Sequence, residues 1–196
     1  MSLQAVCDRI QLPDLQLLGK AQARLDCLTK PQGSLGRLEE VAARYVMVTG
    51  ELKPAIPRGV VFTFAADHGV TKEGVSAYPR EVTPQMVLNF LRGGAGVNVL
   101  ARHAGVGVRV VDIGVDHDFG TMPDLISKKV MRGTRNLLVE PAMTRAEAEQ
   151  SVLIGVELAT QAAQEGVGLI GTGDMGIGNT TPSAAITAVM TGRPVS

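Results

Sequence analysis

The sequence predicts an α/β protein in which a parallel sheet is flanked by helices and preceded by an N-terminal helical arm. Two observations support this fold class. From about residue 58 onward, short apolar runs rich in β-branched residues alternate with longer segments of helical periodicity, as in β-α-β units. Before residue 58, only helical patterns occur. We therefore expect a helical arm and linker over residues 1–57 and an α/β domain over residues 58–196.

The arm is expected to contain two amphipathic helices. The first covers residues 14–28, whose apolar positions are spaced by three and four. Pro31 and Gly33 interrupt it, and Ser34 can cap the second helix. The polar side chains at this second start could bind an anion, but capping and solvated charge explain them equally well; they are Lys30, Ser34 and Arg37.

The first clear strand covers residues 59–65, a β-branched and aromatic run that ends just before Asp67 and His68. Ligands of open α/β sheets bind outside the carboxyl ends of the strands, so chemistry is common at such a position. We interpret His68 as a structural or substrate-orienting group, with a general base as the alternative, because no Ser or Cys nucleophile stands in a recognisable elbow. The polar loop 71–79 has the composition of a pocket rim.

A long helix is expected over residues 83–104, with Thr83 as N-cap and Pro84 as the first helical residue. A glycine pair at positions 93 and 94 permits a bend or close packing. The second strand follows over residues 106–114. Because one helical segment separates the two strands, we expect them to be parallel and joined by a right-handed crossover.

Residues 115–143 show no regular pattern. Asp116, His117 and Asp118 adjoin one another there, but neighbouring loop positions are poorly spaced for a metal, and we expect no metal site. The basic segment 128–136 is interpreted as solvated charge, with phosphate contact as the alternative.

The best-defined helix begins with a capping box, Thr144 and Glu147, and ends at Gly166. An apolar strand over residues 167–170 leads into the glycine-rich segment 171–182.

This glycine-rich segment is expected to form a turn, with Thr181 as N-cap and Pro182 as the first residue of a helix that runs through Met190. Glycines let the backbone approach a ligand, and the free N–H groups and positive dipole end of a helix attract an anion. The segment therefore predicts a phosphate cradle. A glycine-rich turn without a ligand is the alternative.

Two phosphate-binding motifs almost fit this segment. Gly171, Gly173 and Gly176 spell G-x-G-x-x-G, but no acidic residue follows Asp174 to bind a ribose, which argues against a dinucleotide. A Walker A pattern also fits, except that Asn179 replaces the lysine that reaches the outer phosphates. We therefore expect no cofactor and a site for one phosphate, that of a ribose phosphate or a nucleoside monophosphate.

Asp67, Asp112 and Asp174 all fall at or just beyond the ends of expected strands. Parallel order would gather them along one edge of the sheet, beside the glycine-rich turn. There they could orient ribose hydroxyls or stabilise positive charge that develops on a sugar ring. Helix capping and turn formation compete as explanations for each acid singly.

Composition excludes several classes of partner. Of the 196 residues, 19 are Lys or Arg and 19 are Asp or Glu, aromatic residues make up 3%, and Trp is absent, so we expect no nucleic-acid partner. No apolar run reaches membrane-spanning length and no secretory signal begins the chain, so we expect a cytoplasmic protein without a membrane partner. Cys7 and Cys27 are expected to be free, buried thiols.

Four long segments occur in the order and composition of a known family; they are KPQGSLGRLE (30–39), ADHGV (66–70), EGVSAYP (73–79) and GDMGIGNTTP (173–182). On these segments the chain resembles the nicotinate-nucleotide:dimethylbenzimidazole phosphoribosyltransferases. The resemblance implies a homodimer with a Rossmann-like sheet and a phosphoribosyl-binding domain over residues 58–196. The implied reaction transfers phosphoribose from nicotinate mononucleotide to 5,6-dimethylbenzimidazole, with inversion, and yields α-ribazole 5′-phosphate and nicotinate in cobalamin biosynthesis.

Carried over position by position, the resemblance implies that four residues lie near the aromatic acceptor; they are Tyr78, Gln85, Met86 and Met175. It assigns the phosphoribosyl group to the turn from residue 174 to 181, where the expected contacts are Gly176, Gly178, Asn179, Thr180 and Thr181.

The chain departs from the family pattern in two respects. Asp174 stands where family members commonly have glutamate, so we expect it to have only a supporting catalytic role. The family's general base, a glutamate, belongs to a later portion, so we expect this chain to be an amino-terminal part that is inactive alone. The alternative function is a non-enzymatic protein that binds a ribose phosphate or nucleotide.

Overall fold

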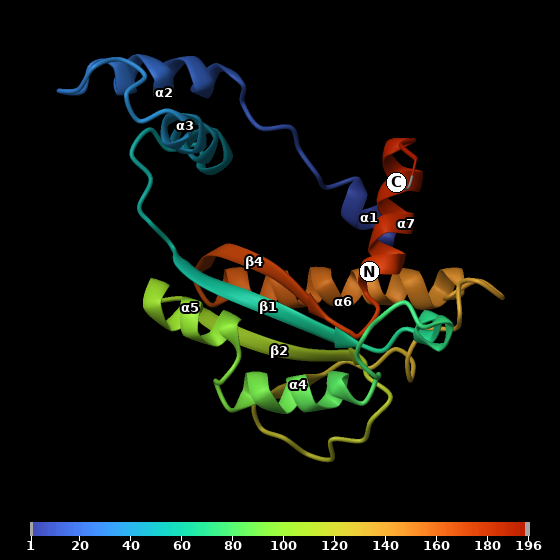
Figure 1. Cartoon of the computed structure of the whole chain (residues 1–196). Coiled ribbons are helices and arrows are strands. Elements are labelled where there is room, and N and C mark those ends of the chain that lie inside the picture. Colours follow the sequence, from blue (N-terminus) through green and yellow to red (C-terminus); the bar gives the residue numbers. More distant parts are fainter. Residues whose placement is uncertain (1, 195–196) are drawn as a thin grey trace. The chain divides into compact units, whose positions relative to one another are not determined.

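A computed structural model of the chain describes residues 2–194. The chain forms two compact units, Met1–Ile56 and Pro57–Ser196 (Figure 1).

Helices make up the first unit; they are α1 (Leu3–Cys7), α2 (Gln16–Asp26) and α3 (Arg37–Thr49). The helices α2 and α3 pack against each other through Ala21, Ala43 and Val46, so both predicted helices of the arm exist. Cys7 and Cys27 are free but exposed. The expectation that they are buried is wrong, because neither belongs to this packed cluster.

The start of α3 differs from the prediction that Ser34 caps it. The helix begins after Gly36, whose φ of 54° is readily adopted only by glycine. The carboxylate of Glu39 reaches back and accepts hydrogen bonds from Leu35 N at 3.1 Å and Lys30 Nζ at 2.8 Å. Glu39 is only 5% exposed and already pairs with the ammonium of Lys30, so the geometry favours a structural role for Lys30 over anion binding.

The second unit contains a four-stranded sheet in the order β3-β2-β1-β4, with every neighbouring pair parallel. This arrangement confirms the predicted parallel sheet flanked by helices. The strands are β1 (Arg58–Ala66), β2 (Gly107–Gly114), β3 (Leu125–Ser127) and β4 (Val167–Met175). The helices are the 3-10 helix η1 (Gly69–Glu73), α4 (Val82–Leu91), α5 (Gly96–Ala104), α6 (Arg145–Gln164) and α7 (Thr180–Thr191).

Alternating strand positions fill two apolar cores, one on each face of the sheet. Val110 packs with Val87 and Phe90 of α4, whereas the next residue, Val111, packs with Leu158 of α6. The helices α4 and α6 thus cover opposite faces. The carboxyl edge of the sheet is left to the loops that follow the strands.

The long helix expected over residues 83–104 is two helices, α4 and α5. The helix α4 ends at Leu91, and Gly93 follows with a φ of 76°, a conformation that no helix interior allows. Thr83 and Pro84 lie inside the first turn rather than at its start. The predicted cap is wrong because a tight turn at residues 79–83 already winds the chain before them.

The glycine-rich segment is also divided differently from the prediction. Its residues 171–175 belong to β4, because β1 is long enough to pair with them, from Val61 opposite Gly171 to Ala65 opposite Met175. The helix α7 begins at Thr180, so the prediction that Thr181 is its N-cap is wrong. The strand β3 escaped prediction since a strand of three residues has no periodic pattern.

Candidate functional site

The order of the strands identifies one crevice at the carboxyl edge. From β1 the chain moves outward to β2 and β3, then returns through α6 to place β4 on the other side of β1. The loops after β1 and β4 therefore leave the sheet where its order reverses, which is where open α/β sheets bind ligands. These loops are residues 67–81 and the turn 176–179.

The turn 176–179 lies directly against the segment that follows β1. A Cβ on Gly176 would stand 2.1 Å from Ala66 O and 2.8 Å from His68 Nε2. A Cβ on Gly178, whose φ is 81°, would stand 2.9 Å from Thr71 Cγ2. Close approach of backbone requires the glycine at position 176, and the left-handed φ together with the Thr71 methyl group requires the one at 178. These constraints explain part of the glycine-rich sequence without any ligand.

A hydrogen bond from Ile177 N to Thr83 Oγ1, 3.1 Å long, fixes the middle of this turn to α4. Thr83 is fully buried. Sequence reasoning missed this role, because the partners are distant in sequence and Thr83 matches the pattern of a helix cap.

Along the turn, amide groups that donate a hydrogen bond alternate with amide groups that do not. Asn179 N donates to Gly176 O at 3.0 Å and Thr181 N donates to Gly178 O at 3.2 Å. The amides of Gly176, Gly178 and Thr180 have no acceptor within residues 2–194. Three free N–H groups at the N-terminus of α7 form the kind of cradle that binds a phosphate.

Asp67 and Asp174 both lie at this edge but differ in solvent exposure. Asp174, opposite Phe64 in the sheet, is exposed, and its Oδ2 accepts a hydrogen bond from Asn179 Nδ2 at 2.6 Å. Asp67 is 3% exposed; its Oδ2 accepts from Asp116 N at 2.8 Å, while Oδ1 has no partner in the described part of the chain. Of the two carboxylates, only Asp174 is accessible to a ligand.

Asp112, the third acid of the predicted set, is turned into its own loop. Its Oδ1 accepts a hydrogen bond from Val115 N at 2.9 Å, and its Oδ2 pairs with Lys129 Nζ at 2.8 Å. These contacts favour the turn-forming explanation for Asp112.

His68 is half-buried beside the turn. Burial lowers the pKa of its imidazole below the ordinary value, because desolvation disfavours the charged form. The carboxylates of Asp174 and Asp67 act in the opposite direction.

The residues assigned to the aromatic acceptor come from three segments. Met86 and Met175 pack against the same apolar core on the α4 face. Gln85 is exposed on α4, and Tyr78 is 67% exposed in the loop before it. The structure therefore brings the two methionines to one core and leaves the two polar side chains at the surface.

The adjacent residues 116–118 do not form a metal centre. Asp116 is held by Arg80 and, at 3.7 Å, by Arg132 Nη1; the hydrogen bond from Arg80 lowers the pKa of the Asp116 carboxyl. Within residues 2–194, no group of three or more His, Cys, Asp or Glu side chains could hold a metal ion.

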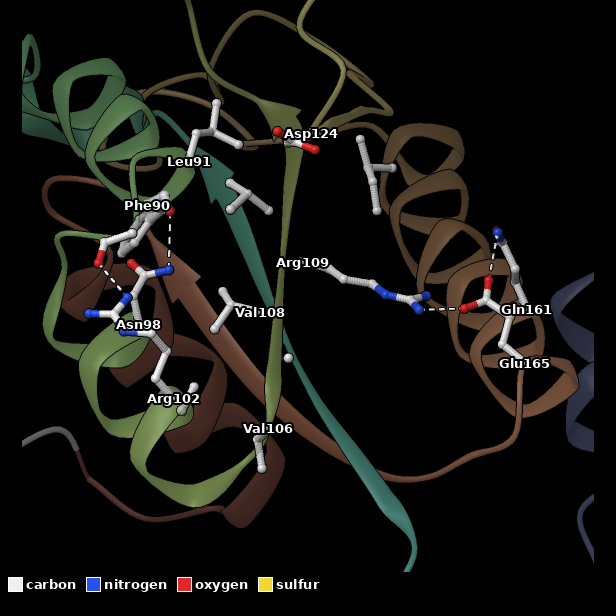
Figure 2. Close-up of a pocket in the computed structure, with 15 residues that line it drawn as sticks. Phe90, Leu91, Asn98, Arg102, Val106, Val108, Arg109, Asp124, Gln161 and Glu165 are labelled. Carbon is white, nitrogen blue, oxygen red and sulfur yellow. Dashed lines mark hydrogen bonds and ion pairs between the residues drawn. The ribbon is translucent and has the colours of Figure 1, made fainter.

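A cavity of about 610 Å³ lies at the opposite edge of the sheet, beside β2 (Figure 2). It opens because β3 pairs only with residues 110–112 of β2. Arg109 points across it to Glu165, and Asn98 donates to Phe90 O at 3.1 Å (Figure 2). None of the residues assigned to substrate lines this cavity.

An open parallel sheet with a cradle of free amides at its switch point defines an α/β domain of the kind that binds phosphorylated ligands. The family model described as phosphoribosyltransferase matches residues 10–196, and the chain belongs to this family.

Curated relatives bear the name nicotinate-nucleotide–dimethylbenzimidazole phosphoribosyltransferase. The protein of Geobacter sulfurreducens is 66% identical over 93% of this chain and 52% of its own length. That of Geotalea uraniireducens is 61% identical over 98% of this chain and 55% of its own length. The chain thus spans about half the length of the curated relatives it matches.

A solved structure agrees with this similarity. The crystal structure of the Thermus thermophilus enzyme of the same name matches with a TM-score of 0.88 and 52% identity, over 92% of this chain and 55% of that chain. In the described residues, no helix is both long and apolar enough to cross a membrane.

Proposed function

We propose that this chain is the phosphoribosyl-binding part of an enzyme that transfers phosphoribose from nicotinate mononucleotide to 5,6-dimethylbenzimidazole, giving α-ribazole 5′-phosphate and nicotinate in cobalamin biosynthesis. The observation that carries the proposal is the set of three free amides, those of Gly176, Gly178 and Thr180, at the N-terminus of α7. The names of the relatives support it.

In this proposal the cradle binds the 5′-phosphate and thereby fixes the ribose above the end of β4. The free N–H groups donate to the phosphate, and the positive end of the α7 dipole adds to the attraction. The exposed carboxylate of Asp174 stands beside the turn, where it stabilises positive charge on the sugar as the bond to nicotinate breaks. Asp174 thus has a supporting electrostatic role.

The acceptor is a flat, apolar base with one nucleophilic ring nitrogen. Met86 and Met175 supply polarisable apolar surface for its face, and Tyr78 and Gln85 border it. The nitrogen attacks the anomeric carbon from the side opposite nicotinate, which leaves with the electrons of the broken bond. The other ring nitrogen then loses its proton to a base. We predict that this base lies outside this chain.

Three further statements belong to this proposal. The protein is a homodimer, it acts in the cytoplasm, and it needs no cofactor. The domain boundary after residue 57 and the contact roles of Asn179 and Thr181 stay predictions.

The experiment that tests the proposal compares two ligands on the chain as it stands. Calorimetric titration with nicotinate mononucleotide is expected to show binding on the order of 100-fold tighter than with nicotinate riboside, which lacks the phosphate, because several charge-assisted hydrogen bonds are lost. Equal affinities would refute the cradle. Adding 5,6-dimethylbenzimidazole and an extended form of the protein should then release nicotinate; binding without release would indicate a carrier instead of an enzyme.

A further inference from the structure

The imidazole of His68 lies against the α-carbon of Gly176, the residue whose free amide opens the cradle. A Cβ on Gly176 would stand 2.8 Å from His68 Nε2 and 2.9 Å from Cδ2. The Nε2 edge of the ring therefore faces the turn itself. The amide nitrogen of Gly176 and this Cβ position are bonded to the same α-carbon, so the free amide of Gly176 lies near this edge.

The backbone around His68 is held on both sides, whereas the ring is not. His68 O accepts hydrogen bonds from Thr71 N at 3.1 Å and Thr71 Oγ1 at 2.8 Å, and Gly69 N donates to Thr134 Oγ1 at 3.2 Å. Within residues 2–194, the ring nitrogens have no hydrogen-bond partner. The ring is thus positioned by its backbone, with its donor and acceptor capacity unused.

The carboxylates around the turn make a further hydrogen-bond donor favourable when a phosphate binds. Asp174 and Asp67 already place negative charge near His68. Asn179, at the position of a Walker A lysine, uses its side-chain amide to bind Asp174 at 2.6 Å. A phosphate dianion beside these carboxylates gains from each donor that faces it, and the imidazole of His68 carries one N–H even in its neutral form.

We propose that His68 is a phosphate-contacting residue: its Nε2–H donates to the phosphoryl group of the nucleotide held by the amides of Gly176, Gly178 and Thr180. The inference rests on the proposed function and assigns to His68 a role in recognising the phosphorylated form of the ligand. The ring also fills the space behind Gly176, so that one residue shapes the turn and binds its ligand.

The test measures the affinity of wild type, His68→Asn and His68→Gln for nicotinate mononucleotide and for nicotinate riboside. We expect His68→Asn to weaken nucleotide binding about tenfold and to leave riboside binding unchanged, because only the nucleotide carries the contacted group. His68→Gln, whose amide extends about as far as Nε2, should recover part of the loss. The matched control is His103→Asn, at an exposed position in the last turn of α5, which should change neither affinity.

A second readout does not depend on a variant that folds well. The chain has three histidines, so imidazole ¹⁵N resonances can be followed during titration. The Nε2 resonance of His68 should shift with the mononucleotide and not with the riboside, while that of His103 stays in place.

Two different failures are distinguishable. A wild type that binds both ligands equally would refute the phosphate cradle, and with it this inference. A wild type that prefers the mononucleotide, while His68→Asn keeps that preference in full or loses affinity for both ligands equally, would overturn the role of His68 alone.

Discussion

The side chain of Asn179 donates a hydrogen bond to Asp174, with Nδ2 and Oδ2 2.6 Å apart, and so links the end of β4 to the start of α7. Asn179 is the N-cap of α7, yet its side chain makes no capping hydrogen bond to that helix. An N-cap asparagine ordinarily accepts a hydrogen bond from an amide of the first turn. The amides from which such a cap would accept are occupied or missing here, because Thr181 N donates to Gly178 O and Pro182 has no N–H.

Asn179→Asp is expected to weaken both the fold and nucleotide binding. Aspartate is favourable at a helix N-terminus, but its carboxylate would lose the hydrogen bond to Asp174 and repel it, so the midpoint of thermal unfolding should fall. The new carboxylate would face Asp174 and the bound phosphate, and calorimetry should show nucleotide binding weaker by at least about tenfold. Asn179→Ala serves as the uncharged comparison and should bind more tightly than the aspartate variant. Equal affinities of the two variants would contradict the anion site.

Gly176→Ala is expected to destabilise the fold and impair the turn. The added methyl group would meet Ala66 O at 2.1 Å, and backbone cannot move aside as a flexible side chain can. Overpacking of this kind costs about 1–3 kcal/mol, to be measured by urea unfolding. The matched control is Gly155→Ala in α6, where a Cβ meets nothing within 4 Å. That change should stabilise by about 0.5–1 kcal/mol, and a similar effect at both sites would disprove the close approach.

Thr83→Val removes the acceptor of the Ile177 amide while nearly preserving shape. The half-buried N–H would lose its partner, at a cost of about 1–3 kcal/mol. Hydrogen exchange should report the local effect as faster exchange at Ile177 than in wild type. Thr83→Ser keeps the hydroxyl and should retain slow exchange at this amide. If the valine variant exchanges as slowly as wild type, the bond does not hold the turn.

The pair Arg135 and Glu147 predicts a defined loss of stability in acid. The hydrogen bond from Arg135, with further bonds from the backbone and side chain of Thr144, lowers the pKa of Glu147 from 4.5 to about 2. A carboxyl whose folded-state pKa is depressed stabilises the fold above its unfolded pKa. This contribution is therefore complete above pH 4.5 and is lost as the pH falls toward about 2.

Urea unfolding of wild type and Glu147→Gln at a series of pH values measures this contribution. The difference between their unfolding free energies should be constant above pH 4.5 and shrink below it. A difference that persists unchanged at about pH 2.5, close to the folded-state pKa of about 2, would show that the carboxylate charge is not responsible.

Local signals predicted much of this structure. The capping box of Thr144 and Glu147 forms as expected, with Glu147 N 3.2 Å from Thr144 Oγ1. The strands at β1 and β2 are parallel as predicted, and the family named from four segments is confirmed by the match over residues 10–196. Each of these features depends on neighbouring residues or on long motifs, so the order of the amino acids carries it directly.

The predicted helix caps are wrong at two positions where the local sequence pattern competes with a partner distant in sequence. Thr83 followed by Pro84 and Thr181 followed by Pro182 both match the start of a helix, yet both pairs lie inside the first turn. In each case the preceding turn already winds the chain, through hydrogen bonds that the pattern does not encode. The hydroxyl of Thr83 is used instead by Ile177, in a turn that only the sheet brings near.

The amino-acid sequence by itself determined the family and the alternation of strands and helices, because periodicity and motifs are properties of consecutive residues. It also predicts the glycine-rich turn as the place for a phosphate. Only the tertiary structure decided which amides of that turn are free and that His68 lies against Gly176. Both depend on β4 pairing beside β1, which brings residues far apart in the chain to one edge of the sheet through hydrogen bonds between their backbones.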